Sequence, residues 1–163
     1  MKKLFVTTAI LLMLLPLTLS AAIDSRRKAI AEIASLTAVG NLDSLRVSLG
    51  NALDSGLTVN ETKEVMVHSY AYCGFPRALQ GLKTLVSVLD ERKAGGISDN
   101  YGREASPLNP NRDKYERGRE VLAEISGVPA DAPKADYAVL APEIEVFLKE
   151  HLFSDLFECA HSG

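Results

Sequence analysis

Apolar residues recur at intervals of three and four along most of the chain, and no stretch alternates convincingly with a period of two. The first spacing gathers apolar side chains on one face of an α-helix, whereas a half-buried strand needs strict alternation. The sequence therefore predicts an all-α fold, a helical bundle with a C-terminal helical extension.

Residues that favour helix ends bound the first two predicted helices. Asp24 or Ser25 can cap the first helix, and Gly40 stands where a helix C-terminal glycine belongs. Asp43 can cap the second helix, and Gly56 ends it. These signals predict two consecutive helices joined by a short turn.

The stretch from Leu57 to Leu89 is the centre of the pattern and predicts a third and a fourth helix. Thr58 and Glu61 form a capping box, which satisfies free backbone N–H groups at the start of the third helix. That helix runs to about Cys73, and Pro76 suits the first turn of the next, where its missing N–H costs nothing. The apolar positions of the fourth helix are Leu79, Leu82, Leu85, Val86 and Leu89.

The composition changes after the fourth helix. Gly, Ser, Asn and Pro dominate residues 95–113, which predicts a linker longer than most loops inside a compact domain. A polar helix is expected over about 114–126, and Pro142 opens a final amphipathic segment. The apolar positions of that segment are Ile144, Phe147, Leu148, Leu152, Phe153, Leu156 and Phe157.

The N-terminus has the layout of a secretory signal peptide. Lys2-Lys3 precede an uncharged, mostly apolar run over 4–19, and Ser20-Ala21-Ala22 suits cleavage. The run is shorter than the ~20 residues that span a bilayer, and Pro16 interrupts it. This favours export, to the periplasm or outside the cell, over a membrane anchor. The predicted organisation is a signal peptide at 1–22, a helical domain at 23–94, a linker at 95–113 and a helical extension at 114–163.

Charge and cysteine content narrow the function classes. The net charge is −3 and the basic residues are scattered, so no nucleic-acid-binding surface is indicated. An oxidising compartment would permit a disulfide between Cys73 and Cys159, although nothing in the sequence requires it. There is no CxxC, no His/Cys cluster with zinc spacing, no GxSxG and no P-loop, so no metal or cofactor is predicted.

The candidate chemistry lies on the third helix. Glu64 and His68 are four residues apart, so their side chains project from one face within reach of each other. A carboxylate beside an imidazole is a workable pair for proton transfer. Tyr72 continues the same stripe with a hydroxyl group. The alternative is an ordinary polar pair on a helix surface.

Two further residues lie at the break between the third and fourth helices. Cys73 immediately precedes the N-terminus of the fourth helix, and such a terminus favours an anion such as a thiolate. The alternative is a small residue buried where two helices meet. Arg77 could hold a carboxylate or phosphate ligand there, or could be a solvated surface residue.

These residues carry a family resemblance. The core motif of the carboxymuconolactone decarboxylase family resembles TVNETKEVMVHSYAYCGFPRALQGL, and its preceding helix and turn resemble VGNLDSLRVSLGNALDSGLT. The resemblance covers roughly Ala29 to Arg92. It implies an all-helical fold shared with alkyl hydroperoxide reductase D-type proteins, and assembly as trimers or hexamers. The named activity of the family is decarboxylation of 4-carboxymuconolactone.

Individual positions follow and depart from the family pattern. Glu64 matches the acidic position of the family helix, and Cys73 replaces a small residue in the Tyr-Ala-Gly-Phe-Pro-like element. Ser48 stands where many members have a His. The hydroperoxide-reductase branch works through a CxxC, so a lone Cys73 does not provide that dithiol chemistry.

The second half resembles the connector that precedes a second copy of the domain in exported bacterial members. The segments are SPLNPNRDKYERGREVLAEISG and APEIEVFLKEHLFSDLF, and the chain then ends at ECAHSG. This resemblance implies an apolar C-terminal element that docks on another subunit or another chain, or a shortened gene.

Three functions remain open from the sequence. The first is cofactor-free proton transfer or decarboxylation of a small carboxylated or lactone substrate, a lyase activity. Glu64 would be the acid/base, His68 its partner, and Tyr72 or Arg77 would position the substrate. The second is a non-catalytic oligomeric binding module, and the third is a thiol-dependent, peroxiredoxin-related activity through Cys73. None involves nucleic acid, or a membrane after signal cleavage.

Overall fold

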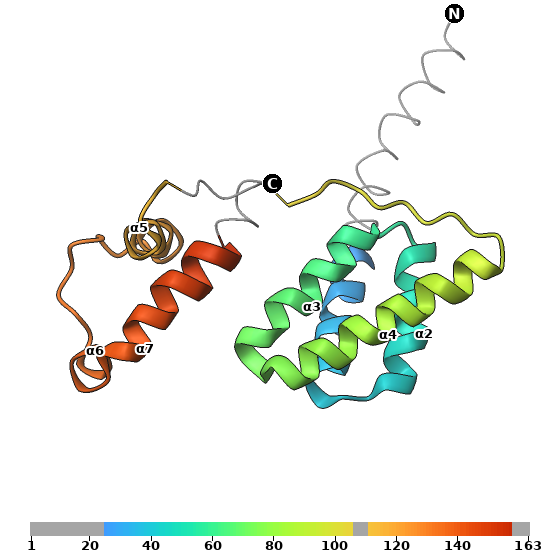
Figure 1. Cartoon of the computed structure of the whole chain (residues 1–163), viewed down its shortest axis with the longest axis horizontal. Helices are drawn as coiled ribbons and strands as arrows, with labels where there is room; N and C mark the ends of the chain where they lie inside the picture. Colours follow the sequence, from blue (N-terminus) through green and yellow to red (C-terminus); the bar gives the residue numbers. More distant parts are fainter. Residues whose placement is uncertain (1–24, 106–110, 158–163) are drawn as a thin grey trace, which may run out of the picture. The chain divides into compact units, whose positions relative to one another are not determined.

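The computed structural model describes residues 25–105 and 111–157, which divide into two compact units between Gly102 and Arg103 (Figure 1). Helices are the regular elements of both described ranges, which contain no strand. The predicted all-α fold is therefore confirmed. The predicted signal peptide and Cys159 lie outside the described residues.

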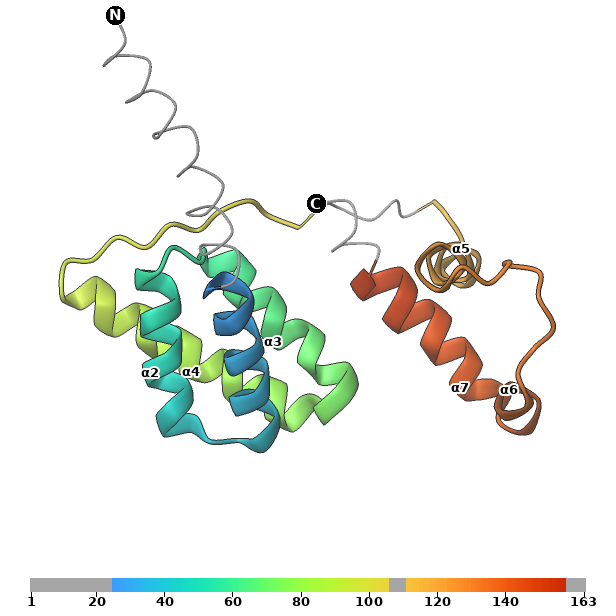
Figure 2. The ribbon, with the colours of Figure 1, turned by 180° about the vertical axis from the view of Figure 1, so that it is seen from behind.

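In its described residues, 25–102, the first unit contains four helices. Residues 25–39 are helical, followed by α2 (Leu42–Asp54), α3 (Val59–Cys73) and α4 (Phe75–Ala94). The helix at 25–39 lies between α2 and α3, and α4 packs against both α2 and α3 (Figures 1 and 2). The unit is thus a small bundle in which α3 and α4 form a helical hairpin.

Three helices of this unit end in the same glycine motif. Gly40, Gly56 and Gly96 have φ angles of 74°, 95° and 81°, a region that favours glycine. In each case the glycine N–H and the N–H of the next residue donate to carbonyls of the last helical turn. This is the Schellman arrangement, and it confirms the helix ends predicted at Gly40 and Gly56.

The helix starts follow the predicted capping chemistry with one correction. At the start of α3, Thr58 and Glu61 form the predicted capping box. At the start of α2, Asn41 is the cap in place of the predicted Asp43, because its side chain accepts the Ser44 N–H at 3.2 Å. The turn at Gly40 is so short that α2 begins before Asp43 is reached.

A segment after α4 completes the start of α3. The backbone N–H groups of Val59 and Asn60 donate to the carbonyls of Asn100 and Tyr101 at 2.9 and 3.1 Å. N–H groups in the first turn of a helix have no partner within the helix. The segment at 97–102 therefore acts as an external cap, and these two bonds attach the C-terminal end of the first unit to the start of α3.

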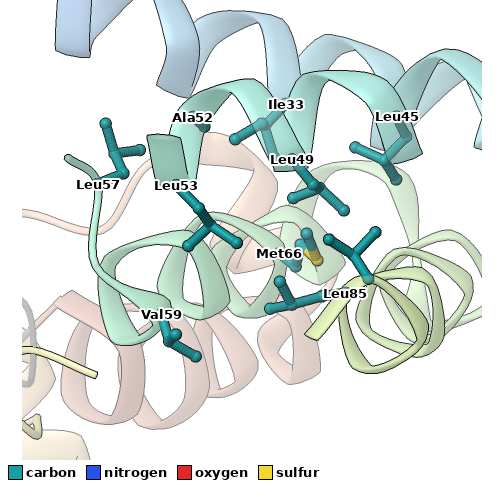
Figure 3. Packing of buried hydrophobic residues seen from close by; sticks show 10 residues of the cluster. Ile33, Leu45, Leu49, Ala52, Leu53, Leu57, Val59, Met66 and Leu85 are labelled. Atoms are coloured by element: carbon teal, nitrogen blue, oxygen red, sulfur yellow. The ribbon is translucent and has the colours of Figure 1, made fainter. Parts of the chain in front are cut away.

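The core of the first unit is aliphatic. Its buried side chains come from all four helices and from the turn before α3, and they meet around Leu49 and Met66 (Figure 3). Its buried members are Ile33, Leu45, Leu49, Ala52, Leu53, Leu57, Val59, Met66, Leu85 and Val88. The core fixes the orientation of α3 and with it the candidate site residues.

The predicted buried face of α4 is confirmed at Leu85, with Leu82 and Leu89 packed against the core, and wrong at two positions. Leu79 and Val86 are exposed, whereas small residues such as Ala78 and Gly81 are buried. A Cβ on Gly81 would lie 3.1 Å from Thr37 Cγ2 and 3.3 Å from Met66 Sδ. Small residues face the bundle because α4 approaches its neighbours closely, and this leaves a second apolar stripe on its outer side.

The described part of the second unit contains α5 (Lys114–Ser126), α6 (Asp136–Leu140), α7 (Pro142–Phe147) and a π-helix, η1 (Leu148–Phe157), that continues α7. The helix predicted at 114–126 and the start at Pro142 are confirmed. α5 packs along η1. None of the helices in the described ranges has both the length and the apolar character needed to cross a bilayer.

Polar side chains occupy part of the interior of this second unit, which corrects the predicted apolar face. Ile144 and Phe147 are exposed, while Glu145 and Ser154 are buried. Ser154 Oγ accepts a hydrogen bond from Arg117 Nη2 at 2.7 Å. The apolar spacing predicted the wrong buried face at these positions, because hydrogen-bond partners on α5 make burial of the two polar groups favourable.

Candidate functional site

Glu64 and His68 lie on the side of α3 opposite Met66, one turn apart. Both side chains are half-buried, whereas Met66 is fully buried in the core. The Lys63 Nζ lies 3.6 Å from Glu64 Oε1. The predicted pair is therefore present as neighbours on the outer face of the helix, with a cation beside the carboxylate.

The environment of His68 favours its neutral form. Burial lowers the pKa of the imidazole below its ordinary value of 6.5, and the Glu64 carboxylate opposes part of that shift. At neutral pH the ring is uncharged and offers one nitrogen as an acceptor. An uncharged imidazole beside a carboxylate can accept a proton from a substrate.

The predicted members at the C-terminal end of α3 have different surroundings. Tyr72 is 72% exposed. The Cys73 thiol is free and half-buried, and it donates a hydrogen bond to the Ser69 carbonyl at 3.0 Å. The thiol proton thus has an acceptor within α3.

Arg77 lies at the end of the bundle where the helix at 25–39 turns into α2. A Cβ on Gly40 would come within 1.6 Å of the Arg77 Nη1. The guanidinium therefore rests against the backbone of the Gly40 turn. Glu64 and His68 are brought together by α3, and Arg77 belongs to this separate contact at the helix junction.

A second polar cluster joins the helix at 25–39 to α2. Ser48 is buried, and its Oγ donates to Glu32 Oε1 at 2.5 Å. Together with Lys28, Asn51 and others they line a cavity of about 220 Å³. The sequence indicated Ser48 only as a departure from a family histidine, and Glu32 was missed.

A sequence signal for this cluster existed. Lys28 and Glu32 are four residues apart on one helix, and Ser48, Asn51 and Ser55 recur at helical spacing on the next. Such polar stripes are usually exposed to solvent. Here the two stripes face each other across the helix pair, and this packing creates the polar cavity. No group of three or more His, Cys, Asp or Glu side chains within the described ranges could hold a metal ion.

Residues 9–86 match the model described as Carboxymuconolactone decarboxylase family. The match includes α2, α3 and more than half of α4. It begins and ends earlier than the resembling segment, which runs from roughly Ala29 to Arg92. No curated protein and no solved structure matches the chain.

Proposed function

Since residues 9–86 match the model of the carboxymuconolactone decarboxylase family, we propose that the chain catalyses cofactor-free proton transfer coupled to decarboxylation of a small carboxylated or lactone substrate. The observation that carries this proposal is the placement of Glu64 and His68, both half-buried, one turn apart on one face of α3. Burial there lowers the pKa of the His68 imidazole. Membership of the family supports the reaction class and leaves the individual substrate open.

The reaction needs one proton. Loss of CO2 from a carboxylated lactone breaks a C–C bond and leaves its electron pair conjugated with the lactone carbonyl. A proton must then reach the substrate, and solvent supplies it through the pair. Glu64 acts as the acid/base, His68 holds and returns the proton, and Tyr72, one turn further along α3, positions the substrate. General acid–base catalysis of this kind contributes about 10²–10⁴ in rate.

The test is turnover of 4-carboxymuconolactone, followed by CO2 release. Glu64→Gln and His68→Ala should each lower kcat by about 10²-fold or more, while circular dichroism stays that of the unchanged chain. Cys73→Ser is the matched control on the same helix, and should leave turnover unchanged. Unchanged turnover in both Glu64→Gln and His68→Ala would exclude the assignment, and loss of activity in Cys73→Ser alone would favour the thiol chemistry.

A second candidate function, a non-catalytic oligomeric binding module, is supported by the outer face of α4. Phe75, Leu79 and Val86 are exposed at helical spacing, and Phe75 stacks on Tyr70 with ring centroids 4.6 Å apart. Exposed Lys83 lies between Leu79 and Val86 on this face. A row of exposed apolar side chains rimmed by polar residues is typical of an association surface. A second copy of the chain is the proposed occupant, in a homo-oligomer such as a trimer or hexamer.

The proposal also includes export of the chain from the cytoplasm after cleavage of a signal peptide. The support is the sequence pattern at residues 1–22, a basic start followed by an apolar run and small residues. The intact mass of the chain recovered outside the cytoplasm should correspond to a start at Ile23. Recovery of the uncleaved chain from the cytoplasm alone would contradict it.

A further inference from the structure

A cavity of about 390 Å³ lies within the second unit, among α5, the segment at 127–135, α6 and η1. Its walls are mainly apolar, and include Leu122, Leu148 and Phe153. Phe153 stacks on Phe157 with ring centroids 5.4 Å apart, which fixes one wall. The volume is within the range of small-molecule sites, about 300–1,000 Å³.

One buried carboxylate organises the polar part of this cavity. Glu145 is 4% exposed, and Tyr115 Oη donates to its Oε1 at 2.7 Å. Lys134 Nζ donates to Glu145 Oε2 at 3.1 Å, and Lys149 Nζ also pairs with the carboxylate. The acceptor capacity of Glu145 is therefore taken by side chains of the unit itself.

The charges around the cavity do not balance. Arg119, Lys134 and Lys149 line it, and Glu145 is the only acidic residue among the lining residues. Since Glu116 from outside the lining also pairs with Arg119 Nη2, at 2.6 Å, one positive charge remains in excess. The Arg119 side chain is 37% exposed, but its Nε is buried and has no hydrogen-bond partner among the residues that the structure describes. A buried donor without a partner is uncommon in folded proteins, and it suits a ligand that brings an acceptor.

We propose that this cavity binds a small amphipathic carboxylate, with its apolar body against Leu122, Leu148 and Phe153 and its anionic end against Arg119 and Lys134. The apolar walls bind the hydrocarbon, and the excess positive charge selects an anion over a neutral or cationic molecule. The site lies in the second unit and is independent of the reaction proposed for Glu64 and His68.

The test uses the full chain and octanoate as the probe, by titration calorimetry and by ¹H–¹⁵N spectra. Octanoate should bind and shift amides of α5 and η1, and octan-1-ol should bind at least about tenfold more weakly because it lacks the charge. Arg119→Gln and Lys134→Gln should each weaken octanoate binding by about tenfold. Lys83→Gln changes the net charge equally at an exposed site of the first unit, and should leave binding unchanged.

A shape variant tests the cavity without changing charge. Ala123→Leu adds volume at a lining position and should weaken octanoate and octan-1-ol alike, while the spectrum remains that of a folded chain. The proposal is overturned if octanoate does not bind at millimolar concentration, if octan-1-ol binds equally well, if Lys83→Gln weakens binding as much as Lys134→Gln, or if the shifted amides lie in the first unit.

Discussion

Gly118 on α5 lies directly against the backbone of Lys149 on η1. A Cβ at Gly118 would come within 1.8 Å of the Lys149 carbonyl oxygen and 2.5 Å of its carbonyl carbon. The obstacle is backbone, so no side-chain rotation can relieve it. This contact sets how closely the two main helices of the second unit approach.

Gly118→Ala should therefore destabilise the second unit, by about 1–3 kcal/mol, because the two helices must separate to admit a methyl group. Gly50→Ala is the matched control, since Gly50 lies inside α2 with open space around it, and it should stabilise the first unit by about 0.5–1 kcal/mol. Hydrogen exchange of amides in each unit measures both effects. Equal protection of α5 in Gly118→Ala and the unchanged chain would contradict the close contact.

Arg92 binds two carboxylates that differ in exposure. Its Nη2 lies 2.8 Å from Asp99 Oδ1 and 2.9 Å from Asp54 Oδ1, and the side chains of Asp99 and Asp54 are 9% and 65% exposed. Asp99→Asn should cost about 1.5–3 kcal/mol, because charge-assisted bonds in a buried position are lost. Asp54→Asn should cost about 0–1 kcal/mol, as for other exposed pairs.

Urea denaturation of the two variants measures that difference. Asp99→Asn should also speed exchange of the Val59 and Asn60 amides, because Asp99 anchors the segment whose carbonyls accept them. If Asp54→Asn is as destabilising as Asp99→Asn, burial does not decide the strength of these pairs.

The second unit should lose stability in acid through Glu145. Hydrogen bonds from Lys149, then from Tyr115, lower the pKa of Glu145 from its ordinary 4.5 to about 2. A carboxyl group with a lowered pKa in the folded state contributes stability that is complete above pH 4.5, and that contribution is lost as the pH falls toward 2. Thermal unfolding between these pH values measures this contribution.

Glu145→Gln should remove this part of the acid dependence. At pH 7 it should also destabilise the second unit by about 1–3 kcal/mol, because Lys149 keeps its charge and loses its acceptor. Glu143→Gln, an exposed neighbour on α7, is the control and should change little. If the stability of Glu145→Gln fell with pH as much as that of the unchanged chain, other carboxylates would be responsible for the loss of stability in acid.

His68 should titrate below an ordinary histidine, and Glu64 should limit that shift. Because the carboxylate raises the pKa of His68 against the lowering by burial, Glu64→Gln should lower the pKa of His68 further. Chemical shifts of the imidazole against pH measure this, with Tyr72→Phe as a control on the same face. A higher or unchanged pKa in Glu64→Gln would show that the two side chains are not coupled.

The apolar stripe on α4 should hold copies of the chain together. Leu79→Lys and Val86→Lys together place two charges on that stripe and should reduce an oligomer to monomers in sedimentation velocity. Val47→Lys, at an equally exposed apolar residue on α2, should leave the assembly intact. Equal dissociation by Val47→Lys would indicate that charge alone, rather than the α4 surface, controls association.

Local features of the fold were predictable because they depend on neighbouring residues. A glycine such as Gly56 ends a helix through bonds to its own last turn, and the Thr58–Glu61 box spans four residues. The spacing of Glu64 and His68 is likewise a property of one helix. These features survive in any arrangement of the helices, so the sequence predicts them.

The sequence by itself determined most of the helices, several of their ends and the similarity of residues 9–86 to the family model, whereas only the tertiary structure decided which face of each helix is buried. Leu79 and Ala78 are adjacent, and packing at Gly81 buried the smaller one. Glu145 and Ser48 became buried polar groups because their partners lie on other helices. Burial of a polar group is favourable only when a partner meets it in space, and spacing along one helix cannot show that partner.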